Sequence, residues 1–236
     1  MFYNVRCKRF PNGKEQYQFY EIPKEYGYSP EKRKHTGLTV ERKEVENARR
    51  AVQKVYDYAH SNSFDYFLTL TFDGSKIDRY SYDACADALK MFTDIMRHNG
   101  NKWLIVPEQH KDGAYHFHAL VSGSLSLVEA INPHTGQKIL DKHGRQVYNV
   151  RNFKFGHTTA TGISDPTRAA TYIAKYLTKD IQVPKGRKRY WASRSLCAPI
   201  EERLQMTAEE YGEIFNSARY QKVIDSPWGH FLLCET

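Results

Sequence analysis

The sequence predicts an α+β fold, in which helices cover one face of a central antiparallel sheet. Two observations lead to this prediction. Segments rich in aromatic and β-branched residues alternate with segments whose apolar residues recur at helical spacing. A short turn, Lys111-Asp-Gly-Ala114, joins two of the strand-like segments and is typical of antiparallel neighbours. A chain of 236 residues is long enough to bury a real core.

The first elements are a lead-in, a helix and a strand. Residues 1–38 are polar and broken by three prolines, so we expect an irregular or short-stranded lead-in. Residues 41–60 carry apolar side chains at helical spacing, among them Val45 and Val52, and predict a helix. Residues 64–72 (Phe-Asp-Tyr-Phe-Leu-Thr-Leu-Thr-Phe) favour a central strand because aromatic residues and Thr suit a pleated sheet.

The remaining elements continue this alternation. Helical spacing returns in 80–98, and Asp165-Pro166 is a helix-starting pair that precedes a third helix at 167–180. Turn signals at Thr135-Gly136 and His143-Gly144 predict an inserted hairpin. The remaining predicted strands are 102–110, 115–121 and 151–157, and a helical then strand-like tail follows from 199 to 236.

These elements divide the chain into three parts. We expect an N-terminal lead-in at 1–40, a main domain at 41–195 with the inserted hairpin near 124–150, and a C-terminal extension at 196–236 packed on the same domain.

The composition favours a polyanionic partner. Lys and Arg number 35 against 27 Asp and Glu, a net charge of +8, and the chain has 17 Tyr and 12 Phe. Aromatic rings among basic residues suit stacking on unpaired bases, although many of these rings will be core. The four cysteines form no Cys-x-x-Cys pair, which argues against a zinc knuckle or a disulfide framework. No signal-peptide pattern or bilayer-length apolar run occurs, so we expect a cytoplasmic protein without membrane partners.

The tripeptide His116-Phe117-His118 is the most informative motif. On a strand both imidazoles project from one face. Across the four-residue turn Glu108 falls opposite His116, which completes a set of ligands suited to a divalent cation with open positions. Gln109 and His110 are substitute ligands if the hairpin is bulged. The alternative, one core histidine beside a surface histidine, stays open on the pair alone.

Two tyrosines form the second motif. Tyr172 and Tyr176 share one helical face, and Lys175 and Lys179 each lie three residues after a tyrosine. A phenol is a plausible nucleophile toward a phosphodiester if a nearby cation lowers the cost of forming phenolate. Exposed structural tyrosines are the alternative. We expect the opposite side of this helix to be buried, through Ala170, Ile173, Ala174 and Leu177.

A basic aromatic run follows this helix, at Lys185-Gly-Arg-Lys-Arg-Tyr-Trp191. Such a run can grip phosphates and stack a base, and a solvated loop is the alternative. The residues assigned to DNA contact here are Lys185, Arg187, Lys188, Arg189 and Trp191.

Together these motifs resemble those of the HUH endonuclease superfamily, specifically the two-tyrosine rolling-circle replication initiators of phages and plasmids. The resemblance rests on three segments in family order: Phe67–Phe72, Gly113–Leu120 and Tyr172–Tyr176. It implies a five-stranded antiparallel sheet of the ferredoxin-like, RRM-like palm type, with the histidines central. It also implies that the first of these segments lies near bound DNA, through Thr69 and Thr71.

The resemblance further implies a sequence-specific single-strand endonuclease and strand transferase. Mg²⁺ or Mn²⁺ would be held by Glu108, His116 and His118, and a tyrosine would form a 5′-phosphotyrosine intermediate at a replication origin. Tyr172 with Lys175 matches the single-tyrosine pattern, and Tyr176 with Lys179 repeats it, so the order of attack stays open.

The implied partners are single-stranded origin DNA, a host helicase and a host polymerase in the cytoplasm of a bacterium. The sequence has no Gly-x-x-x-x-Gly-Lys-Ser/Thr loop, so we expect no nucleotide cofactor. A relaxase or transposase with the same chemistry, or a non-catalytic binder of single-stranded nucleic acid, are the alternatives.

Overall fold

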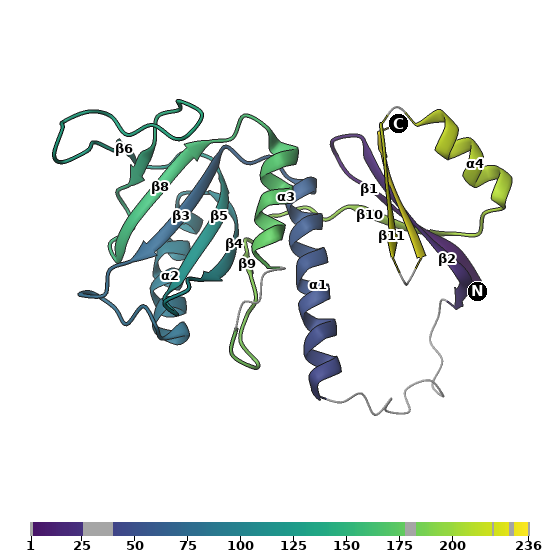
Figure 1. The fold of residues 1–236 in the computed structure, drawn as a ribbon, viewed down its shortest axis with the longest axis horizontal. Coiled ribbons are helices and arrows are strands. Elements are labelled where there is room, and N and C mark those ends of the chain that lie inside the picture. The colour runs from purple at the N-terminus through teal and green to yellow at the C-terminus, as the bar shows by residue number, and fades with distance from the viewer. Residues whose placement is uncertain (1, 26–39, 178–182, 219, 227–228, 236) are drawn as a thin grey trace. The chain divides into compact units, whose positions relative to one another are not determined.

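The computed structural model describes residues 2–25, 40–177, 183–218, 220–226 and 229–235 (Figure 1). The chain divides into two compact units. Unit 1 combines Met1–Thr39 with Cys197–Thr236, and unit 2 is Val40–Leu196. Among the described residues, none of the helices is both long and apolar enough to cross a membrane.

Unit 2 contains a seven-stranded antiparallel sheet in the order β6-β7-β8-β3-β5-β4-β9. Its strands are β3 (Tyr66–Phe72), β4 (Lys102–Gln109), β5 (Tyr115–Ser122), β6 (Leu127–Glu129), β7 (Tyr148–Val150), β8 (Gly156–Gly162) and β9 (Trp191–Ala192). The α+β class is confirmed, but the expected five-stranded sheet is wrong. Four long strands are extended at one edge by β6 and β7 from the insertion and at the other by β9, which follows the basic run.

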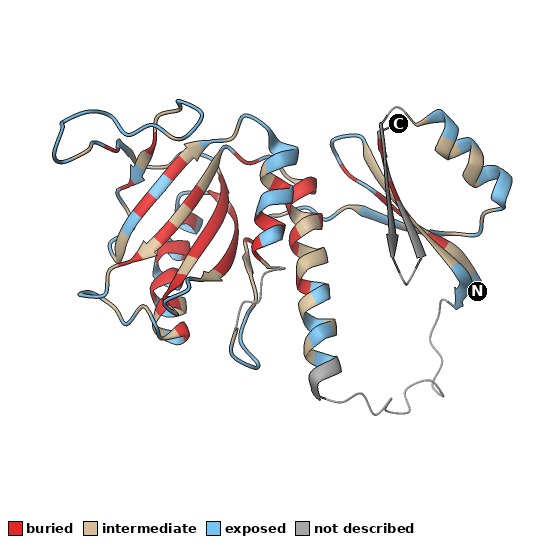
Figure 2. Cartoon of the chain, in the orientation of Figure 1, coloured by how far each residue is buried: buried red, intermediate tan, exposed pale blue. Residues whose placement is uncertain are grey.

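Helices cover both faces of this sheet, rather than the one face expected. The helices are α1 (Val40–Ser61), α2 (Tyr82–His98) and α3 (Pro166–Tyr176). Leu68, Leu70 and Phe117 pack with α2 on one face, and Leu104 and Leu120 pack with α1 and α3 on the other. The long strands are therefore largely buried, as Figure 2 shows. Alternation along the strands divides their side chains between two apolar layers.

The strand predicted at 151–157 instead begins at Gly156 and runs to Gly162. The loop before it carries Phe153, which is buried, so an apolar loop residue imitated a strand pattern. In β8 itself the buried side chains are those of Thr158 and Ala160, small residues that carry a weak hydrophobic signal.

Unit 1 joins the two ends of the chain in one five-stranded sheet, ordered β10-β1-β2-β12-β11. The strands are β1 (Phe2–Arg9), β2 (Lys14–Glu25), β10 (Ile200–Leu204), β11 (Tyr220–Ser226) and β12 (Gly229–Glu235), and the helix is α4 (Ala208–Ser217). The sequence predicted an irregular lead-in and an extension packed on the main domain. The structure differs because β1 pairs with β10 and β2 with β12, partners about 200 residues apart in the chain.

Candidate nuclease site

The three central strands bring the predicted ligands into one row. In the register, His116 on β5 faces Glu108 on β4 and Thr71 on β3. His118 faces Thr69 on β3 in the same way. All five side chains therefore share the face of the sheet that α1 and α3 cover, as the hairpin geometry predicted for Glu108.

Thr69 and Thr71 hold the two imidazoles. Thr71 Oγ1 lies 3.1 Å from His116 Nδ1, and Thr69 Oγ1 lies 3.2 Å from His118 Nδ1. The predicted role of these threonines in DNA contact is therefore replaced by one in orienting the histidines. The sequence signal was available, because Thr-x-Thr on one strand lies in phase with His-x-His on its neighbour.

Glu108 contacts the other side of the second imidazole. Its Oε2 lies 2.6 Å from His118 Nε2, and both side chains are largely buried. The first imidazole stacks on His110, with ring centroids 3.9 Å apart. Burial, followed by the nearby His110 and His118, lowers the pKa of His116 to about 4. His116 is therefore neutral at pH 7, which is the form that binds a metal.

The donor set fits a divalent metal in its chemistry. With Nδ1 engaged by threonine, each imidazole keeps Nε2 for a ligand, and Glu108 supplies a carboxylate on the same face. As they stand, no three His, Cys, Asp or Glu side chains among the described residues are arranged to hold a metal ion. The contact between Glu108 and His118 would have to open to admit one. Of the substitute ligands, Gln109 instead donates its amide to the Gly113 carbonyl oxygen, at 3.0 Å.

Helix α3 places the two tyrosines beside this row. Asp165 caps the helix by accepting from Arg168 N at 2.9 Å, and Pro166 follows as its first residue. The Tyr176 ring stacks on the His118 ring, with centroids 3.7 Å apart and planes 17° apart. The Tyr172 ring lies 5.0 Å from that of Tyr176, edge to face.

The two tyrosines differ in exposure, contrary to the prediction of one exposed face. Tyr172 is 49% exposed, whereas Tyr176 is 7% exposed. The difference arises because Tyr176 lies at the edge of the buried stripe that contains Ile173, where its ring covers the imidazole. Burial, the hydrogen bond with Tyr172 and the negative charge of Glu108 raise the pKa of Tyr176 far above its ordinary value.

Two further site residues have different standings. Phe67, which lay within the first motif but received no role, contacts both Tyr172 and His118, at centroid distances of 5.5 and 5.8 Å. Lys175 is exposed on α3, one turn after Tyr172. Lys179 lies outside the described residues.

The basic run at 185–191, hereafter the basic segment, is attached to two helices. Arg187 pairs with Asp83 of α2 at 2.6 Å, and Arg189 pairs with Glu44 of α1 at 3.1 Å. The Tyr82 hydroxyl donates to the Lys188 carbonyl oxygen. Lys185 and Lys188 are exposed.

Trp191 does not join the expected DNA surface. Its ring packs against Phe117, at 5.2 Å, and Tyr82, at 6.1 Å. These contacts lie on the α2 side of the sheet, opposite the histidines, because β9 pairs Trp191 with Ile105. Trp191 therefore belongs to the core, and its predicted base-stacking role is corrected.

Comparison with known families identifies the class of protein that this fold and site define. Residues 65–181 match the family of replication-associated proteins that includes ORF2. The matched part is a replication-associated protein domain, and it contains the three site strands and the tyrosine helix. The predicted resemblance to rolling-circle replication initiators is thereby supported. No curated protein and no solved structure matches the chain.

Proposed function

We propose that this protein nicks single-stranded DNA at a replication origin and later rejoins the ends, using a tyrosine of α3 as nucleophile. One observation carries the proposal: the tyrosine helix lies directly on the histidine strand. Tyr176 stacks on the same imidazole that Glu108 contacts at 2.6 Å. A nucleophile helix packed on a row of metal-type donors suits phosphodiester cleavage better than a purely structural role.

Tyr172 is the first nucleophile in this proposal. Its exposure lets a phosphate approach the phenol oxygen, whereas Tyr176 is covered. The raised pKa of Tyr176 also disfavours its phenolate in this state. Lys175, one turn on, supplies positive charge near the first phenol.

The proposed chemistry is a transesterification. Tyr172 Oη forms a bond to phosphorus as the bond from phosphorus to the 3′-oxygen breaks. The phenol loses its proton to solvent, and the leaving 3′-oxygen takes up a proton. The 5′-phosphate stays on the tyrosine, so a later attack by a 3′-hydroxyl can restore the phosphodiester without another energy source.

The other residues position the reactants. Thr69 and Thr71 fix the imidazole rings, and Glu108, His116 and His118 would hold Mg²⁺ or Mn²⁺. Such an ion supplies Lewis-acid polarisation of the scissile phosphate when bound. The exposed cations of the basic segment would hold the strand through its phosphates. We place this reaction in a bacterial cytoplasm, with a host helicase and polymerase acting on the nicked template.

The test uses labelled oligonucleotides that tile the single-stranded form of the replicon encoding the protein. With Mn²⁺, wild type is expected to form a covalent adduct that survives denaturing electrophoresis. His118→Ala should abolish the adduct while retaining much of the DNA binding. An adduct that persists in the double variant Tyr172→Phe/Tyr176→Phe would exclude both tyrosines as nucleophiles.

Trypsin separates the two tyrosines, which allows the attacking residue to be identified directly. Cleavage after Arg168, Lys175 and Lys179 leaves Tyr172 and Tyr176 on different peptides. After nuclease digestion of the adduct, mass spectrometry should find the nucleotide on the peptide 169–175. A nucleotide found first on the peptide 176–179 would reverse the proposed order.

A further inference from the structure

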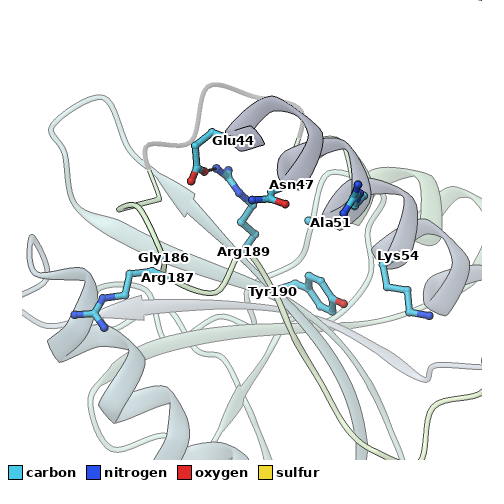
Figure 3. Close-up of a pocket in the computed structure, with 9 residues that line it drawn as sticks. Glu44, Asn47, Ala51, Lys54, Gly186, Arg187, Arg189 and Tyr190 are labelled. Atoms are coloured by element: carbon cyan, nitrogen blue, oxygen red, sulfur yellow. Dashed lines mark hydrogen bonds and ion pairs between the residues drawn. The ribbon is translucent and has the colours of Figure 1, made fainter. Parts of the chain in front are cut away.

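A groove lies in unit 2 between α1 and the basic segment, which we call the α1 groove (Figure 3). Its volume is about 530 Å³, within the range of roughly 300–1,000 Å³ typical of small-ligand sites. It can accept a nucleotide but not a duplex. The lining residues are Glu44, Asn47, Arg50, Ala51, Lys54, Gly186, Arg187, Arg189 and Tyr190.

The lining is strongly basic. Four cations, Arg50, Lys54, Arg187 and Arg189, face one carboxylate, that of Glu44. Because the cations come from two separate elements, an anion between them is approached from both walls. Arginine has five donors, so an arginine that is paired with one carboxylate can still donate to a phosphate.

Glu44 occupies one of these cations internally. Its Oε2 lies 3.1 Å from Arg189 Nη2, and the side chains are 35% and 23% exposed. Figure 3 shows this pair at the α1 side of the groove. A carboxylate placed there competes with any incoming phosphate for the guanidinium, so it lowers the affinity of the groove for anions.

We infer that the α1 groove binds a backbone phosphate of single-stranded DNA, and that Glu44 restrains this binding by holding Arg189 until the phosphate replaces it. The identity of the ligand as DNA rests on the proposed function. The partly buried Tyr190 gives the attached nucleoside an aromatic surface. The α1 residues of this groove received no role from the sequence.

The test measures equilibrium binding of fluorescein-labelled oligothymidylate, without metal, in a Tyr172→Phe/Tyr176→Phe background. Arg50→Gln should weaken binding about two- to fivefold, the range expected of one exposed ion pair. It should also lower the slope of log K against log salt by about 0.7, for one lost phosphate contact. Arg49→Gln is the matched control, since it removes the same charge from the neighbouring exposed position outside the lining.

Glu44→Gln supplies the discriminating result because a gain cannot come from damage to the fold. It should tighten oligothymidylate binding by a similar two- to fivefold. Inorganic phosphate, added as competitor at constant ionic strength, should displace the oligonucleotide only weakly, because a strand makes further contacts.

Two results would overturn the inference. One is equal weakening by Arg50→Gln and Arg49→Gln together with no tightening by Glu44→Gln. The other is complete displacement by free phosphate near its own binding concentration, which would make the groove a simple anion site. Neither result touches the proposed function, which fails separately if wild type forms no tyrosine adduct.

Discussion

The Tyr176 ring lies 3.7 Å from the His118 ring and within 17° of parallel to it. This stacking joins the helix that carries the proposed nucleophile to the strand that carries the proposed metal ligands. Neither group can move without disturbing the other. Substitutions that alter the histidine rings or the start of α3 should therefore affect cleavage even though they touch no reacting atom.

Thr71→Val should reduce metal-dependent cleavage by about ten- to a hundredfold, which is typical of losing a group that orients a metal ligand. Valine has the shape of threonine but cannot bond His116 Nδ1. Cleavage rates at increasing Mn²⁺ provide the measurement, and oligonucleotide binding should be unchanged. Thr159→Val is the control, because Thr159 is the exposed register partner of Thr69 on β8. Equal losses in both variants would remove the orienting role.

The stability of the protein should depend on the protonation of His116. Its pKa falls from 6.5 to about 4 on folding, so between these values the unfolded chain binds more protons. The contribution is complete above pH 6.5 and is lost as pH falls toward 4. Urea unfolding with a chelator present should show the stability of wild type, relative to His116→Gln, decreasing as the pH is lowered through this window. A difference that stays constant with pH would contradict the burial of this imidazole.

Asp165→Ala should destabilise unit 2 by about 1 kcal/mol, as expected for loss of a helix cap. The Asp165 carboxylate accepts from Arg168 N at 2.9 Å, and alanine offers no acceptor. Asp165→Asn keeps an acceptor and should lose much less. Denaturant midpoints measure the change, and adduct yield should fall in the same order if α3 positions the nucleophile. Equal stability of the alanine and asparagine variants would exclude the cap.

Gly156→Ala should destabilise unit 2 by about 1–3 kcal/mol, through overpacking at the start of β8. A Cβ at this position would fall on the Thr71 carbonyl oxygen, and the backbone of Phe72 and Asp73 leaves no room for it to shift. Gly162→Ala, at the other end of the same strand, meets nothing within 4 Å and is the matched control. Thermal unfolding distinguishes them, and similar losses would mean that general strand effects dominate.

The sequence was most reliable where a local pattern determines the structure. Helical spacing located α1 and α2 closely, and the four-residue turn set the register that places Glu108 opposite His116. It was least reliable where structure depends on distant partners. The pairing of β1 with β10 and of Trp191 with Ile105 cannot be read from either segment alone.

By itself, the sequence determined the chemistry available to this protein: two histidines and a carboxylate in phase on neighbouring strands, and two tyrosines one helical turn apart. Local periodicity fixes these relationships, because side chains repeat every two residues in a strand and about every 3.6 in a helix. Only the tertiary structure decided which tyrosine is exposed, that Thr69 and Thr71 hold the imidazoles, and that α1 lines a basic groove. Those outcomes depend on packing between elements that are remote in sequence, whose contacts have no periodic signature.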